Sequence, residues 1–222
     1  MYQEEARHSP EEKYRERGNL EKEASLGTTI MAVAFKDGVI LGADTRTSMG
    51  TYISNRVSRK ITKLIDRVFT CRSGSAADTQ AVSDTVEVQM KEQIFCHHEI
   101  PSVKDVAILA KKIIYKNDWL QAGLIIAGVD HTGGRIFSIP LGGALVEQKC
   151  AIGGSGSIYV TGLCDRTFKE NMTKEEAIAF VKTIVSHAMY RDNSSGGCIR
   201  MMVVTQDAEE EIFVPGDELV IG

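Results

Sequence analysis

The spacing of hydrophobic residues predicts a strand hairpin immediately after Gly27. Residues 28–35 alternate in the manner of a strand, and Lys36-Asp37-Gly38 then supplies turn residues typical of a hairpin. Residues 38–44 are mostly apolar and read as the partner strand. A further pair of strands is predicted at 51–57 and 63–74.

Helix-like segments follow this first group of strands and alternate with further strands. Ser102 and Asp105 have the spacing of a helix start, and Thr173 and Glu176 have that of a capping box. The predicted helices are 75–95, one that begins at 102, 157–171 and one that begins at 173. The remaining predicted strands are 120–130, 134–143, 199–206 and 211–220.

The order of these elements favours an α+β fold. Strands are followed by two helices, then strands, two more helices and closing strands, and the joints carry hairpin signals rather than repeated βαβ crossovers. Antiparallel sheets packed against helices are the expected outcome. No internal repeat or linker interrupts 28–222, so we expect these residues to form one domain.

Residues 1–27 differ from the rest of the chain in composition. They contain seven Glu, five Lys or Arg, and few side chains suited to a core. Such a segment cannot bury enough apolar area to offset the entropy lost on ordering. It also lacks the apolar centre of a signal peptide. By composition alone it is expected to be a disordered tail.

The composition of the whole chain argues against several functional classes. A net charge of −4 is unlike that of a dedicated nucleic-acid binder, and no run of 18 apolar residues is present to cross a membrane. The five cysteines are odd in number, scattered and without a CxxC pair, which is typical of a reducing compartment and not of a disulfide framework or zinc site. We therefore expect a protein of the cytoplasm and nucleus, with no nucleic-acid or membrane partner.

Several separated motifs resemble one known family. The motifs are Gly27-Thr28-Thr29, GADTR at 42–46, Lys60, CRSGSAADTQ at 71–80, GGSGS at 153–157 and RDNSSGG at 191–197. Together and in this order they resemble the catalytic beta subunits of the proteasome core particle, and Arg72 resembles the caspase-like type that cuts after acidic residues. The resemblance implies the four-layer αββα sandwich of the N-terminal-nucleophile hydrolases, with two antiparallel sheets between helix layers. It also implies that 1–27 is a propeptide removed on maturation and that 28–222 is the hydrolase domain.

Thr28 is the expected nucleophile of such an enzyme. A threonine hydroxyl is a poor nucleophile unless a base takes its proton. Cleavage of the Gly27–Thr28 bond would give Thr28 a free α-amine, whose reference pKa of about 7.7–8.0 leaves a usable neutral fraction near neutral pH. One residue would then hold both the nucleophile and the base.

Lys60 and Asp44 are expected to assist Thr28. An ammonium group near Thr28 favours loss of the hydroxyl proton and keeps the amine from charging. Asp44 would pair with Lys60 and hold it charged and oriented. A Lys–Asp pair by itself is more often a surface feature, and only the resemblance assigns this one to the site.

Four further residues take catalytic roles through the resemblance. The backbone N–H of Gly74, in the turn between a strand and a helix, is expected to stabilise the developing oxyanion. Ser155, Asp192 and Ser195 are expected to hold the α-amine and a nearby water. Read without the resemblance, these Gly- and Ser-rich segments are ordinary turns.

Arg72 is expected to set the preference for acidic cleavage sites. A guanidinium in the first substrate pocket attracts Glu or Asp through charge-assisted hydrogen bonds. The resemblance places Thr47, Ser58 and Thr79 around the same pocket as polar walls. The sequence departs from related subunits at Ser48-Met49, where they carry Thr-Thr, and this departure bears on the shape of the pocket.

The expected function is therefore that of a threonine endopeptidase made as an inactive precursor. Thr28 would attack the carbonyl of Gly27, and hydrolysis of the resulting ester would release the propeptide. The resemblance implies alpha and beta subunits in stacked heptameric rings as partners, unfolded polypeptides as substrates, and no cofactor or catalytic metal.

Two alternatives remain at this level. One is a non-catalytic subunit of the same ring, against which the joint presence of Thr28, Asp44 and Lys60 argues. The other is a small amidase of the same fold that acts alone, with a closed site fitted to one small substrate.

Overall fold

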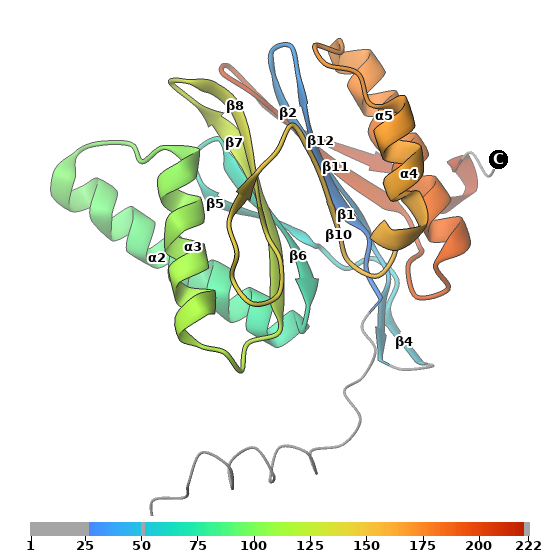
Figure 1. Cartoon of the computed structure of the whole chain (residues 1–222), viewed down its shortest axis with the longest axis horizontal. Helices are drawn as coiled ribbons and strands as arrows, with labels where there is room; N and C mark the ends of the chain where they lie inside the picture. Colours follow the sequence, from blue (N-terminus) through green and yellow to red (C-terminus); the bar gives the residue numbers. More distant parts are fainter. Residues whose placement is uncertain (1–26, 50–51, 220–222) are drawn as a thin grey trace, which may run out of the picture.

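The computed structural model describes residues 27–49 and 52–219 (Figure 1). The proposed propeptide, apart from Gly27, lies outside the described residues. No helix in the described ranges is long and apolar enough to cross a membrane.

Two five-stranded antiparallel sheets form the centre of the molecule (Figure 1). The strands of the first sheet, in spatial order, are β10 (Cys150–Gly153), β1 (Ile30–Phe35), β2 (Gly38–Asp44), β11 (Ile199–Thr205) and β12 (Glu209–Val214). Those of the second are β5 (Ile61–Ile65), β6 (Val68–Gly74), β7 (Ala122–Asp130), β8 (Gly133–Ile139) and β9 (Val146–Glu147). A separate two-stranded sheet pairs β3 (Thr47–Met49) with β4 (Tyr52–Asn55).

Helices cover the outer face of each large sheet. The second sheet packs against α2 (Ala76–His97) and α3 (Val103–Lys116), and the first packs against α4 (Ser157–Thr167) and α5 (Lys174–Arg191). A short 3-10 turn, η1 (Gly216–Glu218), follows the last strand. The predicted α+β sandwich with layers in the order αββα is confirmed.

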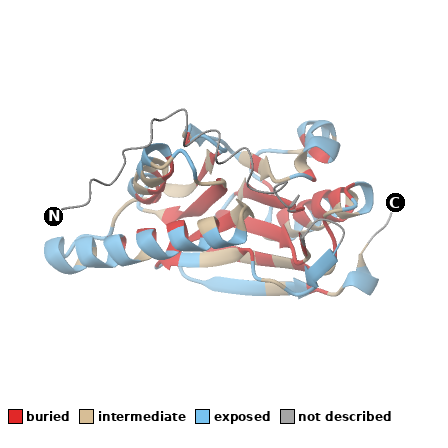
Figure 2. Cartoon of the chain, turned by 90° about the horizontal axis from the view of Figure 1, so that it is seen from below, coloured by how far each residue is buried: buried red, intermediate tan, exposed pale blue. Residues whose placement is uncertain are grey.

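Three apolar clusters correspond to the three spaces between these four layers. One lies between the first sheet and its helices, one between the second sheet and its helices, and one between the two sheets. Figure 2 shows the buried residues concentrated in the sheets and on the helix faces turned toward them. Strand β2 is buried at every position because it lies between β1 and β11 with layers on both faces, which explains its continuous apolar pattern.

Two helix starts follow the capping chemistry read from the sequence. The Ser102 hydroxyl accepts from the Asp105 N–H, and the Asp105 carboxylate accepts from the Ser102 N–H. Thr173 and Glu176 make the same reciprocal pair at the start of α5. Each pair satisfies two backbone donors that a helix otherwise leaves free, which fixes where the helix begins.

The pairing of the early strands differs from the prediction. The segment 63–74 is itself a hairpin, β5 and β6, which turns at Asp66-Arg67 with Arg67 in the left-handed region at φ 58°. The segment predicted at 51–57 instead pairs with β3, and its position 51 lies outside the described residues. Arginine is not a residue type that predicts a left-handed turn, so the hairpin was missed.

Several other element ends also differ from the prediction, among them those of α4 and β12. Helix α4 ends at Thr167 and not at 171, and Asn171 has a positive φ of 56°, which a continuing helix does not allow. Strand β12 ends at Val214 because Pro215 has no N–H for the sheet. Position 220 of that predicted strand lies outside the described residues.

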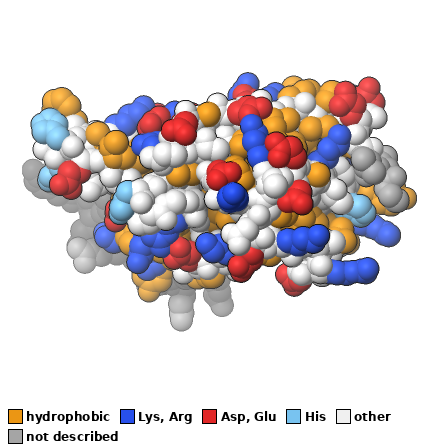
Figure 3. Space-filling model, turned by 90° about the horizontal axis from the view of Figure 1, so that it is seen from above, with side chains coloured by type: hydrophobic (Ala, Val, Ile, Leu, Met, Phe, Trp, Pro, Cys, Tyr) orange, Lys and Arg blue, Asp and Glu red, His pale blue; other side chains and the backbone are white. Residues whose placement is uncertain are grey.

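Acidic and basic side chains are interspersed on the face shown in Figure 3. Charged side chains of neighbouring strands also pair with each other, such as Arg200 with Glu211 at 2.7 Å and Arg135 with Glu147 at 2.8 Å. These are surface pairs, each expected to contribute about 0–1 kcal/mol to stability.

Candidate active site

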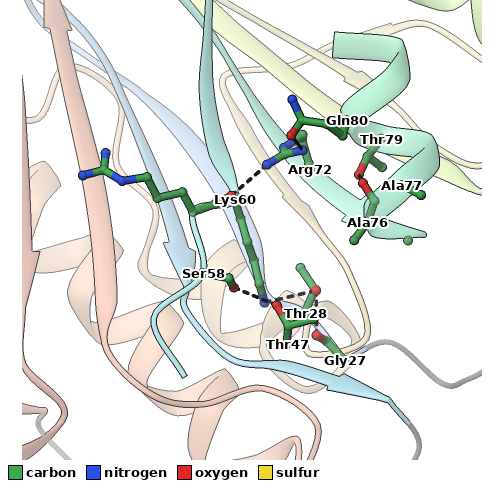
Figure 4. Close-up of a pocket in the computed structure, with 12 residues that line it drawn as sticks. Gly27, Thr28, Thr47, Ser58, Lys60, Arg72, Ala76, Ala77, Thr79 and Gln80 are labelled. Atoms are coloured by element: carbon green, nitrogen blue, oxygen red, sulfur yellow. Dashed lines mark hydrogen bonds between the residues drawn. The ribbon is translucent and has the colours of Figure 1, made fainter. Parts of the chain in front are cut away.

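The Thr28 hydroxyl lies at the entrance to β1, where it meets a lysine and the preceding carbonyl. Thr28 is 6% exposed, and its Oγ1 accepts a hydrogen bond from Lys60 Nζ at 3.1 Å. The same hydroxyl donates to the carbonyl oxygen of Gly27 at 2.6 Å (Figure 4). The oxygen predicted to be the nucleophile therefore lies beside both its expected electrostatic partner and the peptide group expected to be cut.

Lys60 and Asp44 form a buried ion pair next to Thr28. Lys60 Nζ lies 2.6 Å from Asp44 Oδ1, and their side chains are 8% and 0% exposed. Burial lowers the pKa of Lys60 from its usual value, and the neighbouring Asp44 carboxylate acts in the opposite direction. The three residues whose proximity was expected are thus in one hydrogen-bonded chain.

Asp44 also joins two distant parts of the backbone. Its Oδ1 accepts from the Thr29 N–H at 2.9 Å, and its Oδ2 accepts from the Gly196 N–H at 3.0 Å. A buried carboxylate must be paired and hydrogen-bonded, and these contacts meet that need together with Lys60. The carboxylate is therefore held rigidly at the end of β2.

Ser155, Asp192 and Ser195 meet at the backbone nitrogen of Thr28. The Thr28 N–H donates to Ser155 Oγ at 3.1 Å. The hydroxyls of Ser155 and Ser195 in turn donate to Asp192 Oδ2 at 2.7 and 2.6 Å. The loop before α4 and the loop after α5 are thus joined at the nitrogen that would become the α-amine on cleavage.

Two contacts around Thr28 were not foreseen. Thr29 Oγ1 lies 2.8 Å from Ser195 Oγ, and the Gly156 N–H donates to the Thr28 carbonyl at 3.2 Å. For Thr29 the sequence contained a signal, because a polar residue next to an apolar, buried strand needs a hydrogen-bond partner. For Gly156 there was none, since a backbone donor leaves no mark in the sequence.

A cavity of about 370 Å³ opens beside Thr28 and Lys60. All four residues predicted for the substrate pocket line it: Thr47, Ser58, Arg72 and Thr79. Gly74 lines it too, at the end of β6 with φ 102°, a conformation that favours glycine. The remaining lining residues are Gly27, Arg59, Ala76, Ala77 and Gln80.

Arg72 points across this cavity from β6 toward the start of α2 (Figure 4). Its guanidinium donates to the Arg59 carbonyl at 2.8 Å and to Gln80 Oε1 at 2.5 Å, and its Nε has no hydrogen-bond partner. Among the described residues no carboxylate lies within ion-pair distance of it. Burial lowers the pKa of Arg72, and the nearby Asp84 carboxylate acts in the opposite direction. A guanidinium keeps its charge at neutral pH, so the cavity is lined by a cation.

Gln80 was not named from the sequence. It lies in the first turns of α2, where it accepts from Arg72 and donates to Asp84 at 2.6 Å. An eight-residue separation across a strand–helix junction has no local pattern that would predict this contact.

For the two residues that differ from related subunits, Ser48 and Met49, the structure shows one contact with the site. Ser48 does not line the cavity; its hydroxyl accepts from the Gly27 N–H at 3.4 Å. The side chain of Met49 lies outside the described part of the structure. The expected effect on pocket shape stays a prediction.

Gly27 is confined by the loop after α5. A Cβ at this position would lie 1.9 Å from Ser194 Cβ and 2.3 Å from the Ser194 carbonyl oxygen. Because part of this obstacle is backbone, no larger residue fits without moving the loop. The glycine before Thr28 is therefore required by space in this conformation.

Comparisons with known proteins agree with one another. A family profile described as "Proteasome subunit" matches residues 24–204. The chain is 52% identical over 193 residues to a Schizosaccharomyces pombe protein named "Probable proteasome subunit beta type-1", covering 86% of this chain and 85% of the relative. It is 49% identical to "Proteasome subunit beta type-1" of Saccharomyces cerevisiae, with 88% and 92% covered, and 49% identical to "Proteasome subunit beta type-6" of Arabidopsis thaliana, with 90% and 87% covered.

Proposed function

Because the chain belongs to the proteasome family as a beta subunit, a threonine peptidase of the core particle, we propose that it cuts peptide bonds after acidic residues with Thr28 as its nucleophile. The predicted family is confirmed, and membership means assembly with other proteasome subunits. The observation that carries the finer proposal is the hydrogen-bonded chain Thr28–Lys60–Asp44 beside a cavity lined by the Arg72 guanidinium.

The first step of the proposed mechanism is removal of the propeptide. Thr28 Oγ1 attacks the Gly27 carbonyl carbon, the C–N bond breaks, and the nitrogen takes up the hydroxyl proton. Water then hydrolyses the ester and leaves a carboxylate on Gly27 and a free hydroxyl and amine on Thr28. The Lys60 ammonium, 3.1 Å from Oγ1, favours the developing alkoxide.

The second step uses the new amine as the base. The neutral α-amine of Thr28 takes the hydroxyl proton, directly or through a water, while Oγ1 attacks the substrate carbonyl. Ser155, Asp192 and Ser195 hold the nitrogen from one side, as the contacts of the Thr28 N–H suggest. The Gly74 N–H, at the cavity rim, is the proposed donor to the oxyanion.

The remaining parts of the proposal come from the family and the composition. We propose stacked heptameric rings of alpha and beta subunits, unfolded polypeptides as substrates, and a location in cytoplasm and nucleus. Family membership disfavours the lone amidase. The hydrogen bonds that link Thr28, Lys60 and Asp44 argue against a non-catalytic subunit. A covalent probe that reacts with N-terminal threonine would distinguish a catalytic from a non-catalytic subunit.

Intact-mass analysis of this subunit from native particles tests the proposal first. We expect a chain that begins at Thr28, because only then is the free amine available. A subunit that still carries residues 1–27 in mature particles would mean a blocked nucleophile, and the non-catalytic role would replace the proposed one.

Arg72→Gln tests the substrate preference. Loss of a charge-assisted hydrogen bond costs about 1.5–3 kcal/mol, so we expect kcat/KM for substrates with Glu or Asp before the cut to fall about 10- to 100-fold. Peptides with Gln at that position should be cut at an unchanged rate. The measurement is steady-state kinetics on assembled particles with the matched Glu and Gln peptides.

The matched control for this variant is Arg59→Gln. Arg59 also lines the cavity, but its side chain is 66% exposed and pairs with Glu211. We expect little change in the Glu-to-Gln preference. Two outcomes would count against the role of Arg72. One is an equal fall in kcat/KM for the Glu and Gln peptides in Arg72→Gln, and the other is a loss of the Glu preference in Arg59→Gln as large as that in Arg72→Gln.

A further inference from the structure

Two cysteines meet on the side of the molecule where β10 turns into α4. Cys150 is the first residue of β10 and Cys164 lies in α4, and their sulfur atoms are 3.2 Å apart. A disulfide bond is about 2.05 Å long, so an approach of about 1 Å would bring the two sulfurs to bonding distance. Among the described residues the other three cysteines, Cys71, Cys96 and Cys198, form no sulfur–sulfur contact.

A cavity reaches both cysteines. Cys150 is half-buried and Cys164 is 3% exposed, and both line a cavity of about 410 Å³ with Lys149 and Asp165 at its edge. This cavity shares no lining residue with the one beside Thr28. Small polar oxidants therefore have a route to the two thiols that does not pass through the peptidase site.

The two thiols also differ in acidity. The hydrogen bond from Cys150 lowers the pKa of Cys164, while the same bond and burial raise the pKa of Cys150. Cys164 is thus the sulfur that more readily becomes a thiolate, and the thiolate is the nucleophile in thiol chemistry. A neighbouring thiol that can resolve the first oxidation product is typical of redox-sensitive cysteines.

A metal site is a weaker explanation of the pair. A structural zinc site takes four ligands, and within the described residues no group of three His, Cys, Asp or Glu is arranged to hold an ion. If the two cysteines served only as apolar side chains of the core, no cavity beside them would be required.

We propose that Cys150 and Cys164 are a reversible dithiol–disulfide pair that is oxidised by hydroperoxides. The Cys164 thiolate attacks the peroxide oxygen, which breaks the O–O bond, leaves a sulfenic acid on Cys164 and releases the alcohol or water. The Cys150 sulfur then attacks the Cys164 sulfur, a disulfide forms, and the sulfenic oxygen leaves as water. The two thiols lose two electrons and two protons, and the peroxide gains them.

The link would close a ring of chain around a functional loop. The two cysteines are 14 positions apart, and Ser155 and Gly156 lie between them. Those two residues supply the contacts to the backbone nitrogen and carbonyl of Thr28. Oxidation would therefore restrain the loop that holds Thr28, whatever reaction Thr28 carries out.

Peptide mapping of native particles tests the proposal directly. Trypsin cuts after Lys149 and Arg166, so both cysteines fall in one peptide, 150–166. The sample is treated with hydrogen peroxide, quenched with acid and alkylated. We expect this peptide to carry no alkyl group and to be two hydrogen atoms lighter than the same peptide with two free thiols. Chymotryptic cleavage after Tyr159 should leave two fragments that stay joined until a reductant is added.

The peptide 192–200 provides the control within the same digest. Its single cysteine, Cys198, is also half-buried. We expect this thiol to stay reduced during peroxide treatment and to be alkylated afterwards. A Cys198→Ser particle should still form the 150–166 link. Two alkylated thiols in 150–166 after peroxide, or oxidation of either sulfur to sulfinic acid without a link, would overturn the proposal.

Discussion

Particles assembled with Thr28→Ala are expected to retain residues 1–27 on this subunit and to lose its peptidase activity. The variant removes the oxygen that lies beside the Gly27 carbonyl, so neither the precursor bond nor a substrate bond can be attacked. Loss of a covalent nucleophile lowers turnover by about 10⁴-fold or more. Intact mass reports the first effect, and hydrolysis of a peptide with Glu before the cut reports the second.

Thr28→Ser is the matched control. It keeps the hydroxyl, and we expect cleavage after Gly27 and measurable activity at a reduced rate, because serine lacks the β-branch that restricts χ1. A Thr28→Ala subunit that begins at position 28 as quickly as the natural chain would contradict self-cleavage.

Lys60→Ala is expected to lower peptidase activity by about 10²- to 10⁴-fold and to slow removal of the propeptide. The variant takes away the ammonium 3.1 Å from the nucleophile and leaves Asp44 without its charged partner. Breaking a buried ion pair from one side costs about 3–5 kcal/mol, so the yield of assembled particles must be measured beside the rate.

Two further variants separate catalysis from folding. Lys60→Arg keeps a positive charge for Asp44 and should restore assembly, but its planar head group does not reproduce the contact with Thr28 Oγ1 and the rate should stay low. Lys63→Ala removes a lysine three positions away that pairs on the surface with Glu209, and it should change neither readout. Normal activity in well-assembled Lys60→Ala particles would remove Lys60 from the mechanism.

The pH profile gives a second signature of Lys60. Its pKa in the folded chain lies below the usual value, so activity that needs the ammonium should fall as pH rises through that lowered pKa. In the window between the folded and unfolded pKa values the unfolded chain binds more protons, and the contribution of Lys60 to the free energy of unfolding rises with pH. Deprotonation of Lys60 therefore does not itself cause unfolding in this window, and the loss of activity should disappear in any residual activity of Lys60→Arg.

Local sequence was enough to predict the elements whose ends carry their own chemistry. The β1–β2 hairpin turns at Lys36-Asp37-Gly38, and α3 and α5 begin at reciprocal side-chain caps, so each boundary depends on residues close in sequence. Strand β10 was missed because it has four residues and gains its place only by pairing with β1, more than a hundred positions earlier. Such a short strand has too few positions to establish a period.

The site shows the same division between local and distant information. The motifs around Thr28, Asp44 and Lys60 allowed their roles to be predicted by resemblance. The packing of the two sheets then brings Lys60, just before β5 of the second sheet, next to Thr28 and Asp44 of the first. The contact of Arg72 with Gln80 and that of Cys150 with Cys164 depend on how a helix packs against a strand. Nothing in the spacing of these residues fixes that packing.

The loop that confines Gly27 makes recognition of the Gly27–Thr28 bond different from the proposed recognition of substrates. A side chain at position 27 would collide with Ser194, so an acidic residue there, the kind proposed for substrates, has no room in the precursor. In the proposed mechanism, the cut that activates the subunit would be selected by connectivity and close fit, whereas later cuts would be selected by charge in the cavity of Arg72. If the proposal holds, substitutions at the cavity walls would change the cleavage preference, in evolution or by design, without altering maturation.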